Sequence, residues 1–579
     1  MSTRTAFAAM AALLAACSSA PPHLPPAPPQ QSYSQLDAAM RGSAPPVADA
    51  VTFERLVRAR SEPHNWLTYY GAYDGQRFSS LSQITTANVA QLRPAWVFQA
   101  APVGLVASPN SFALEAAPIV VDGVMYLSGW DGYVWAMDAA TGEQLWRYRH
   151  AVPFDVVLCC GNVNRGVAVA RGRVFYSSPN GTLVALDART GKPVWSRQWV
   201  DPRAGESSTM APLVVKNLVI VGSSGAEYGV RGHIDAFDID TGRPVWRRYP
   251  VPKPGEPGSE TWGRNDAWAR GGGAAWITGS YDPQLDLLYW ASANPSPDFD
   301  GSMRPGDNLY TNSVLAIDPD DGTIRWHYQF TPHDLWDYDG VNENILFEHN
   351  GRPVLAHFDR NGYLFVLDRR TGERVSVTQF GDRVNWGRID PTTGRVSDIR
   401  APTREGVEIC PGPAGAKEWP HASYSQQTGL LYTPFLDACA TFQTFPTEFK
   451  ESLSYFGGQF DVAPSQMRGG GVKAFDPSGR LVWEWRSKHP ILASALSTAG
   501  GLVFVGAPDG EFIALDARTG RQLWSFRTGS GIHSNPVTYS VGGKQYVAVP
   551  TGWGGWIKGF APNLYGRDRG SSLIVFALP

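Results

Sequence analysis

The sequence lacks an excess of charge of either sign. Its 579 residues include 50 Lys and Arg against 53 Asp and Glu, a formal net charge of -3. This balance argues against a nucleic-acid-binding surface and against a polybasic membrane patch. Hydrophobic residues make up 43%, with 21 Trp, 22 Tyr and 26 Phe, which is too apolar for disorder. With 61 Gly and 45 Pro, the composition is typical of a large, turn-rich β protein packed with aromatic residues.

No hydrophobic run is long enough to cross a membrane. The apolar run from Ala6 to Ala16 has 11 residues, too few to span about 30 Å of hydrocarbon as a helix. Because Arg4 precedes it, residues 1–16 are predicted to be a signal peptide. Its end, LAAC, resembles the lipobox of bacterial lipoproteins, which implies an acylated Cys17; ordinary cleavage beside an incidental Cys is the alternative.

The segment that follows lacks the residue that retains such lipoproteins in the inner membrane. Ser18 stands where that retention signal has Asp, so the resemblance points to the outer membrane. Residues 17–45 contain the Pro-rich stretch APPHLPPAPPQQ and are expected to form an extended tether. We therefore expect a periplasmic protein that contacts the membrane through its lipid only, with a folded domain over residues 46–579.

Cysteine is scarce and none of it has the spacing of a haem or zinc motif. The chain contains no C-x-x-C-H, so no covalent haem is expected, and zinc-finger spacing is absent. Besides Cys17 there are four cysteines, the adjacent pair Cys159 and Cys160 and the pair Cys410 and Cys439. An even number in an exported chain suggests disulfides.

A short pattern recurs along the chain. Its first copy, residues 136–146, reads AMDAATGEQLW and predicts a strand, an Asp/Thr-Gly turn and a second strand. Clear copies follow at 185–195, 236–246 and 514–524, and weaker ones at 316–326, 366–376 and 474–483. Each is expected to be a hairpin of one sheet, whose Trp packs against the next sheet.

The spacing of the pattern predicts the architecture. Its Asp residues are Asp138, Asp187, Asp238, Asp318, Asp368, Asp476 and Asp516. The commonest gap is near 50 residues, the period of a four-stranded propeller blade. The gap of 108 residues after Asp368 predicts a degenerate blade, and the gap of 80 before Asp318 predicts an insertion. We expect an all-β, eight-bladed β-propeller with Trp-containing repeats, closed by a C-terminal strand at 571–578.

Several further motifs resemble, in the same order, those of the quinoprotein alcohol dehydrogenases. They are NWLTYYGAYDGQRFSSL (65–81), CCGNVNRGVAV (159–169), GSSGAEYGVRG (222–232), NPSPDFDGSMRPGDN (294–308) and TPHDLWDYDG (331–340). Members of that family are eight-bladed enzymes that use pyrroloquinoline quinone (PQQ) and one metal ion. The resemblance covers nearly all of the chain beyond residue 60.

The resemblance implies a cofactor site for a flat tricarboxylic quinone. The residues at the cofactor's edge would be Glu115, Arg165, Thr209, Ser224, Gly225 and Ala226. A planar guanidinium suits carboxylate recognition. A solvated surface residue is the alternative role for a lone Arg or Thr, and only the motif context favours the cofactor role of Arg165 and Thr209.

Two flat walls are implied above and below the cofactor. One would be Trp276, for which blade packing is the alternative role. The other would be the pair Cys159 and Cys160 as a vicinal disulfide; two free buried thiols are the alternative. Cys410 and Cys439 would form an ordinary structural bridge.

The implied metal site consists of Glu227, Asn294 and Asp337, whose hard oxygen ligands suit a Ca²⁺-like ion. Asp337 would also be the catalytic base that takes the alcohol proton while hydride passes to the quinone. Arg360 would place a cation near the quinone oxygens. Asp339, two residues after the base, adds a carboxylate and favours a trivalent lanthanide over Ca²⁺, or else is a hydrogen-bonding residue behind the ligands.

Three departures from the family pattern concern the substrate and the cofactor. A substrate-side Trp is replaced by Asp298, and a second one by Leu492. Because losing two indoles enlarges a cavity, a substrate bulkier than methanol is expected. Glu418 stands where the family usually has Asn before Trp419, which could alter contacts to the cofactor.

The expected reaction is oxidation of a primary or secondary alcohol to an aldehyde or ketone. Since no haem motif is present, electrons would pass to an external cytochrome c. Two alternatives remain: a noncatalytic propeller lipoprotein of outer-membrane assembly, and a quinoprotein sugar dehydrogenase. The first has no reason to carry the CC, SGAE and WDYD motifs together, and the CC pair disfavours the second.

Overall fold

The computed structural model describes residues 51–100, 113–153, 156–554 and 570–579. The predicted signal peptide, Cys17 and the tether lie outside these residues. Within them, the α-helical content is one short helix, α2 (Phe53–Val57), capped by Thr52, whose hydroxyl accepts a hydrogen bond from the backbone N–H of Arg55. In the described part of the chain no helix is long and apolar enough to cross a membrane.

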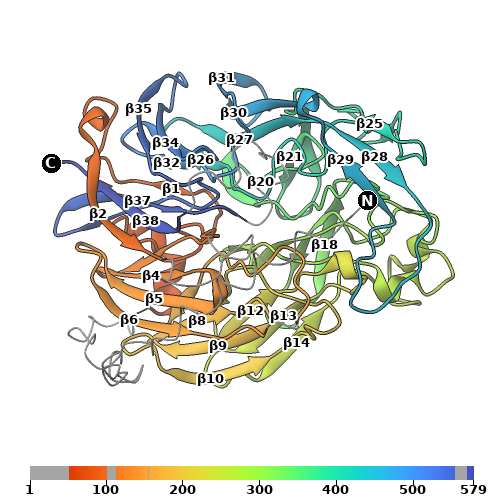
Figure 1. The fold of residues 1–579 in the computed structure, drawn as a ribbon, viewed down its shortest axis with the longest axis horizontal. Coiled ribbons are helices and arrows are strands. Elements are labelled where there is room, and N and C mark those ends of the chain that lie inside the picture. The colour runs from red at the N-terminus through yellow and green to blue at the C-terminus, as the bar shows by residue number, and fades with distance from the viewer. Residues whose placement is uncertain (1–50, 101–112, 154–155, 555–569) are drawn as a thin grey trace, which may run out of the picture. The chain divides into compact units, whose positions relative to one another are not determined.

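The described residues form eight main antiparallel sheets arranged as blades around a common axis (Figure 1). Blades 1 and 2 comprise β3 (Ile119–Val121), β4 (Val124–Ser128), β5 (Tyr133–Asp138) and β6 (Gln144–Arg149), then β7 (Ala168–Ala170), β8 (Arg173–Ser177), β9 (Thr182–Asp187) and β10 (Pro193–Gln198). Blades 3 and 4 comprise β11 (Leu213–Val215), β12 (Leu218–Gly222), β13 (Ile234–Asp238) and β14 (Pro244–Arg248), then β15 (Ser280–Asp282), β16 (Leu287–Ser292), β17 (Ser313–Ile317) and β18 (Ile324–Gln329).

The other four blades complete the series. Blades 5 and 6 comprise β19 (Ile345–His349), β20 (Arg352–Phe358), β21 (Tyr363–Asp368) and β22 (Arg374–Gln379), then β26 (Ser423–Ser425), β27 (Leu430–Ala438), β30 (Met467–Phe475) and β31 (Leu481–Ser487). Blade 7 comprises β32 (Leu496–Thr498), β33 (Leu502–Gly506), β34 (Glu511–Asp516) and β35 (Gln522–Arg527), with β1 (Phe78–Ser79) added parallel to β32. Blade 8 comprises β36 (Val537–Val541), β37 (Lys544–Thr551), β38 (Ser572–Ala577) and β2 (Arg93–Gln99).

Smaller elements connect the blades. Two small sheets contain β23 (Arg388–Ile389) with β24 (Val396–Ser397), and β25 (Val407–Ile409) with β28 (Ala440–Thr444) and β29 (Gly458–Asp461). The described 3₁₀ turns are η2 (Ala59–Ser61), η3 (Val89–Gln91), η4 (Trp130–Gly132), η5 (Ala226–Tyr228), η6 (Ser259–Trp262), η7 (Ala267–Arg270) and η8 (Pro464–Gln466). The turns η6 and η7 lie in the insertion expected before Asp318.

The eight blades confirm the predicted number, but the expected position of the degenerate blade is wrong. The turn at Asp476 joins β30 to β31 of blade 6, which directly follows blade 5. Two excursions fill the 108-residue gap: residues 380–422, and the segment that carries β28 and β29 between β27 and β30. The blade without a repeat motif is blade 8, where β38 pairs with β2 from Arg93 opposite Ala577 to Gln99 opposite Ser572. This pairing replaces the usual hairpin and confirms that a C-terminal strand closes the ring.

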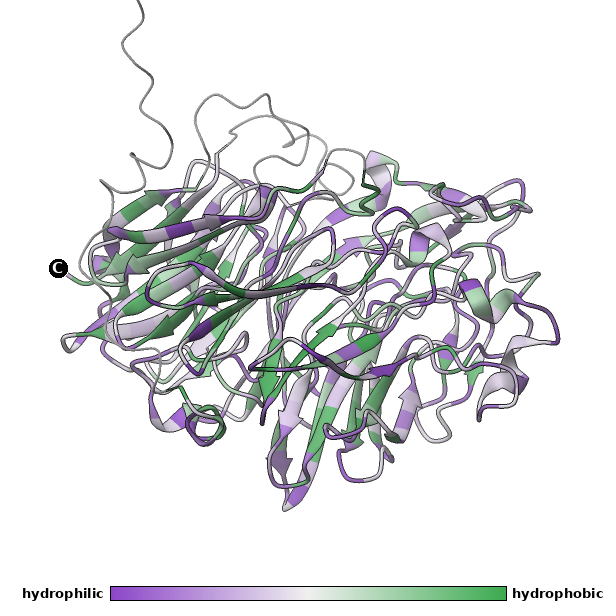
Figure 2. Cartoon of the chain, turned by 90° about the horizontal axis from the view of Figure 1, so that it is seen from below, coloured by the Kyte–Doolittle hydropathy of each residue, from purple (hydrophilic) through white to green (hydrophobic). Residues whose placement is uncertain are grey.

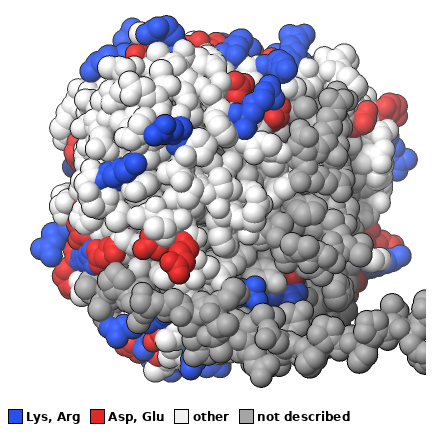
Figure 3. Space-filling model, turned by 60° about the vertical axis from the view of Figure 1, so that its left-hand side comes forward, with Lys and Arg blue, Asp and Glu red and all other residues white. Residues whose placement is uncertain are grey.

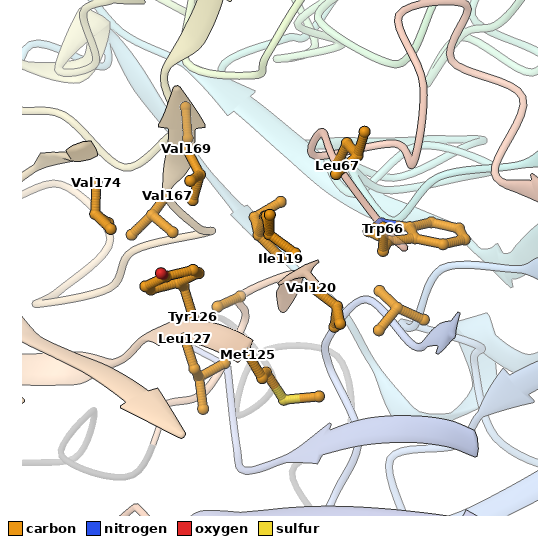
Figure 4. Close-up of a cluster of buried hydrophobic side chains, with 14 of the residues drawn as sticks. Trp66, Leu67, Ile119, Val120, Met125, Tyr126, Leu127, Val167, Val169 and Val174 are labelled. Atoms are coloured by element: carbon orange, nitrogen blue, oxygen red, sulfur yellow. The ribbon is translucent and has the colours of Figure 1, made fainter. Parts of the chain in front are cut away.

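Burial changes from the inner to the outer strand of each blade. All three residues of β7 are buried, whereas five of the six residues of β10 in the same blade are exposed. Hydrophobic and hydrophilic residues are interspersed along the strands (Figure 2). Between blades 1 and 2, Ile119 and Tyr126 lie in one buried cluster with Val167, Val169 and Val174 (Figure 4). Blades 1 and 2 therefore share one buried cluster.

The tryptophan of the repeat packs on the glycine of the next blade's turn. Gly191 has a φ of 68°, and a Cβ there would lie 2.6 Å from the Trp146 ring, so only glycine fits. The Trp146 indole also donates a hydrogen bond to the Ala188 carbonyl at 2.9 Å. The same Trp-Gly packing joins Trp96 to Gly142, Trp195 to Gly242, Trp246 to Gly322, Trp326 to Gly372 and Trp483 to Gly520.

Charged side chains of both signs are scattered over the face shown in Figure 3, separated by uncharged surface. This distribution agrees with the near-balanced composition.

Candidate active site

The candidate site lies at one end of the ring. In each blade the first and second strands are antiparallel, so the start of the first strand and the end of the second lie at the same edge. The candidate side chains lie at this edge, just before a first strand or just after a second strand. Arg165 and Thr209 precede β7 and β11, Glu227 follows β12, and Arg360 follows β20. Because blades surround a common axis, residues far apart in the sequence meet there.

They enclose a cavity of about 250 Å³. Twelve of the predicted site residues line it: Glu115, Cys159, Cys160, Arg165, Thr209, Ser224, Gly225, Glu227, Trp276, Asp337, Asp339 and Arg360. The other two are buried beside it. Ala226 packs in one cluster with Trp276, and Asn294 is 1% exposed and follows Ala293 of the same cluster.

Arg165 connects polar and aromatic parts of the cavity. One of its nitrogens lies 3.0 Å from Glu115, and another donates to the Thr209 hydroxyl at 2.7 Å. Its guanidinium also lies 4.9 Å from the Trp276 ring centre and 4.6 Å from that of Trp419. These contacts hold a planar cation in one orientation toward the cavity.

The expected walls belong to the same cavity. The sulfur atoms of Cys159 and Cys160 are 2.37 Å apart, and a carboxylate oxygen of Glu227 lies within 4.8 Å of both. The Trp276 indole donates to Asp339 at 3.3 Å. Away from the cavity, the Cys410–Cys439 disulfide is formed with an S–S distance of 2.00 Å.

The loop with the motif WDYD is held by the preceding acid. Asp334 accepts hydrogen bonds from the backbone N–H groups of Trp336 and Tyr338, both at 2.8 Å. Asp337 and Asp339 have φ values of 65° and 60°, in the left-handed region that non-glycine residues rarely adopt. Such backbone strain persists where surrounding contacts impose it, and functional sites are common among those places.

Carboxylates gather beside Arg360. Burial raises the pKa of Glu227 to about 7. Burial, with repulsion from neighbouring carboxylates, also raises the pKa of Asp337 and of Asp298 well above the usual range. Burial likewise raises the pKa of Asp339, although Arg360, 2.8 Å away, opposes the shift. A cation at this point would favour the ionised carboxylates.

Orphaned atoms indicate that a cation fits here. In the described residues, one oxygen of Glu227 and both side-chain oxygens of Asp298 are buried without a hydrogen-bond partner. Buried polar atoms without partners are costly, and a metal ion can satisfy them. Hard oxygen donors of this kind match Ca²⁺ or a lanthanide and not a soft metal.

Sequence reasoning missed several lining residues. Phe299, Phe456 and Phe460 form an aromatic side of the cavity, the last two contributed by the segment around β29. His533, which precedes β36, also lines it. Phe299 lies within the motif at 294–308, but no repeat or motif marks Phe456, Phe460 and His533. These three come from an excursion and from the motif-free blade 8.

The three departures lie close to the cavity. Glu418 lines it together with Trp419. Leu492 belongs to a buried cluster with Ala414, which is itself a lining residue. Asp298 is 1% exposed and adjoins the lining residue Phe299 in the chain.

Comparisons with known proteins agree with this geometry. Residues 66–379 and 484–547 match the PQQ family model, which describes the β-propeller domain of glucose, ethanol and alcohol dehydrogenases. The chain is 37% identical over 566 residues to quinoprotein alcohol dehydrogenase PedH of Pseudomonas putida KT2440, covering 92% of this chain and 94% of that one. It is 38% identical over 542 residues to the lanthanide-dependent methanol dehydrogenase of Methylacidiphilum fumariolicum SolV, covering 87% of each.

A solved structure gives the same result. The europium-containing methanol dehydrogenase superposes with a TM-score of 0.84 at 36% identity, covering 91% of this chain and all of that one. The alternative of a noncatalytic scaffold does not fit such relatives. The chain belongs to the PQQ-dependent alcohol and methanol dehydrogenase family, and it is a quinoprotein alcohol dehydrogenase, an oxidoreductase.

Proposed function

We propose that the protein oxidises a primary or secondary alcohol to an aldehyde or ketone with PQQ and one metal ion bound in the described cavity. This proposal rests on one observation: twelve predicted residues from separate blades line one cavity of about 250 Å³. Bound there, PQQ would accept hydride from the alcohol carbon, and the ion would act as a Lewis acid.

Two arginines and two flat walls would bind the cofactor. Arg165, fixed by Glu115 and Thr209, would face an anionic oxygen, with Ser224, Gly225 and Ala226 along the same edge. Trp276 and a Cys159–Cys160 disulfide would exclude water from the two faces. Both cysteines line the cavity, which supports this role.

Asp337 is our proposed catalytic base. It lines the cavity, and Arg360 lies 4.0 Å from its carboxylate and donates to its backbone carbonyl at 3.1 Å. The Asp337 carboxylate would take the hydroxyl proton of the alcohol as the carbon loses hydride, so that the product is a neutral carbonyl compound.

Glu227, Asn294, Asp337 and Asp339 would hold the ion. The fourth of these, Asp339, favours a lanthanide, because three carboxylates offset a trivalent charge better than a divalent one. Ca²⁺ is the alternative. The orphaned oxygen of Glu227 supports a cation of either kind at this position.

The substrate would be bulkier than methanol. The aromatic side made by Phe299, Phe456 and Phe460 supports this assignment, because an apolar wall favours a substrate with apolar surface.

We further propose export to the periplasm, a lipid anchor at Cys17 in the outer membrane, no bound haem, and transfer of electrons to an external cytochrome c.

One experiment tests cofactor, metal and activity together. The purified protein is reconstituted with PQQ and either Ca²⁺ or La³⁺, its absorption spectrum is recorded, and dye-linked oxidation of alcohols of increasing size is measured. We expect PQQ absorbance to remain with the protein after desalting and turnover to depend on both additions. Turnover without PQQ, or no retained PQQ with either ion, contradicts the proposal.

A further inference from the structure

His533 lies in the cavity between two acids. Its Nδ1 is 3.8 Å from a carboxylate oxygen of Glu115, and its Nε2 is 3.6 Å from one of Glu418. Both distances exceed a hydrogen bond. Among the described residues, neither ring nitrogen has a hydrogen-bond partner, although the side chain is only 4% exposed. An imidazole in this state needs a partner that the described residues do not supply.

The ring is held in place from two sides. It packs on Trp419 with 5.0 Å between ring centres. On another side, a Cβ at Gly554 would lie 1.6 Å from Nδ1, so glycine leaves the space that the imidazole occupies. His533 is therefore a packed part of the cavity wall. Contacts with Trp419 and Gly554, together with the two nearby carboxylates, fix the orientation of its ring.

Glu418 supplies the charge. Burial alone would raise its pKa, yet His533 and Arg360 hold that pKa below the usual range. Its other carboxylate oxygen pairs with Arg360 at 2.7 Å. Acids and bases thus alternate across the cavity in the order Arg165, Glu115, His533, Glu418 and Arg360.

This order places one imidazole between the two proposed cofactor arginines. A tricarboxylic cofactor presents three anionic groups, and Glu115 and Glu418 would repel them unless further donors offset their charge. The two arginines are already engaged with these acids. In the described part of the cavity, the Nε atoms of Arg165 and Arg360 also lack a partner, but the terminal nitrogens of both arginines are engaged. In His533, by contrast, both ring nitrogens lack a partner.

We propose that His533 is a cofactor-binding residue, which donates a ring N–H to an anionic oxygen of PQQ, and that Glu418 positions it. This inference rests on the proposed function. It gives a defined role to Glu418, the acid that replaces the family's usual Asn, because its carboxylate lies 3.6 Å from Nε2 and orients the imidazole.

The test measures PQQ binding to ion-loaded apoprotein by quenching of tryptophan fluorescence, which requires no turnover. His533→Phe keeps the aromatic packing and removes the donors. We expect its Kd for PQQ to rise by about tenfold or more, because a charge-assisted hydrogen bond is lost. His533→Asn, which keeps N–H donors on its amide nitrogen, should recover part of the affinity. The matched control is His489→Phe, since His489 lies 3.9 Å from Asp509 outside the cavity and should leave Kd unchanged.

A double-mutant cycle separates positioning from simple repulsion. If Glu418 only repelled PQQ, Glu418→Gln would tighten binding equally in the wild-type and His533→Phe backgrounds. We expect Glu418→Gln to change Kd differently in the two, with tightening only where His533 is already removed.

Each result decides the inference. A wild-type Kd for both His533 variants, or equal effects of Glu418→Gln in both backgrounds, overturns it while leaving the proposed function intact. No PQQ binding by the wild-type protein overturns the proposed function and this inference with it. Circular dichroism shows whether His533→Phe folds; if it does not, His533→Asn and the Glu418→Gln variant alone decide, with weakened binding expected for both.

Discussion

The guanidinium of Arg360 lies 2.8 Å from the carboxylate of Asp339 but 4.0 Å from that of Asp337. The two acids of the motif WDYD therefore differ in their neutralisation by this cation. Asp339 is paired directly, whereas the Asp337 carboxylate, which lines the cavity, is held by the same guanidinium only at the longer distance. This asymmetry supports the two roles that we propose: Asp337 accepts the proton of the alcohol, and Asp339 sets the preference for a lanthanide over Ca²⁺.

Replacement of the proposed base should abolish turnover without unfolding the protein. For Asp337→Asn we expect kcat to fall by about 100- to 10,000-fold, the usual effect of losing a general base. Dye-linked alcohol oxidation measures it, with PQQ absorbance as a check on loading. Normal turnover in a PQQ-loaded Asp337→Asn sample would show that another group takes the proton.

The metal preference should respond to Asp339. In Asp339→Ala the site loses one carboxylate, so a divalent ion neutralises a larger share of the remaining negative charge. We expect the ratio of kcat/KM with La³⁺ to that with Ca²⁺ to be above one in the wild type and to fall in the variant. An unchanged ratio would mean that Asp339 is a hydrogen-bonding residue and not an ion ligand.

Metal removal should make stability depend on pH. Burial raises the pKa of Glu227 from 4.5 to about 7, so its protonated form contributes stability that is complete below about pH 4.5 and is lost as the pH rises through about 7. We expect Tm in EDTA to fall over this range, and Ca²⁺ or La³⁺ to remove the fall by favouring the ionised carboxylate. Glu227→Gln is the control: an equally steep fall in that variant would assign the effect to other groups.

Electrons should leave through a separate protein. Because the chain has no C-x-x-C-H motif, a pyridine haemochrome assay of the purified protein should show no covalent haem. Activity should then require an added acceptor, either a dye or a periplasmic cytochrome c. Alcohol-dependent reduction of a haem on this chain would contradict the prediction.

Blade packing should be sensitive to the Trp-Gly contact. Trp146→Ala removes a side chain that is 7% exposed and should cost about 3–5 kcal/mol in the free energy of unfolding. Denaturant unfolding measures the loss. The control is Ser376→Ala, because Ser376 stands in the one repeat without Trp. There Thr378 contacts Gly479, the glycine of the next turn. A comparable loss of unfolding free energy in both variants would argue against a special role for the indole.

The sequence predicted what repetition and motifs encode. The Asp/Thr-Gly turns indicated seven blades directly, and the motifs named residues that lie together in one cavity. The eighth blade was misplaced because β38 and β2 are joined by pairing between distant segments and carry no hairpin motif. Phe456 and Phe460 were missed because they belong to an excursion from blade 6, whose length the repeat spacing shows but whose path depends on tertiary packing. His533 was missed because a lone His has no pattern; its role emerges from Glu115, Glu418 and Gly554, which only the fold brings near.

The pairing of β2 with β38 also has a consequence for how the ring forms. These strands are about 480 residues apart in the chain, and closing so long a loop costs entropy before their contacts are gained. Until β38 arrives, β2 offers an unpaired strand edge and Trp96 links it to blade 1 through Gly142. Blade 8 should therefore be the last to acquire hydrogen-exchange protection during refolding, and since the cavity takes His533 from the loop before β36, the complete site can exist only after the ring has closed.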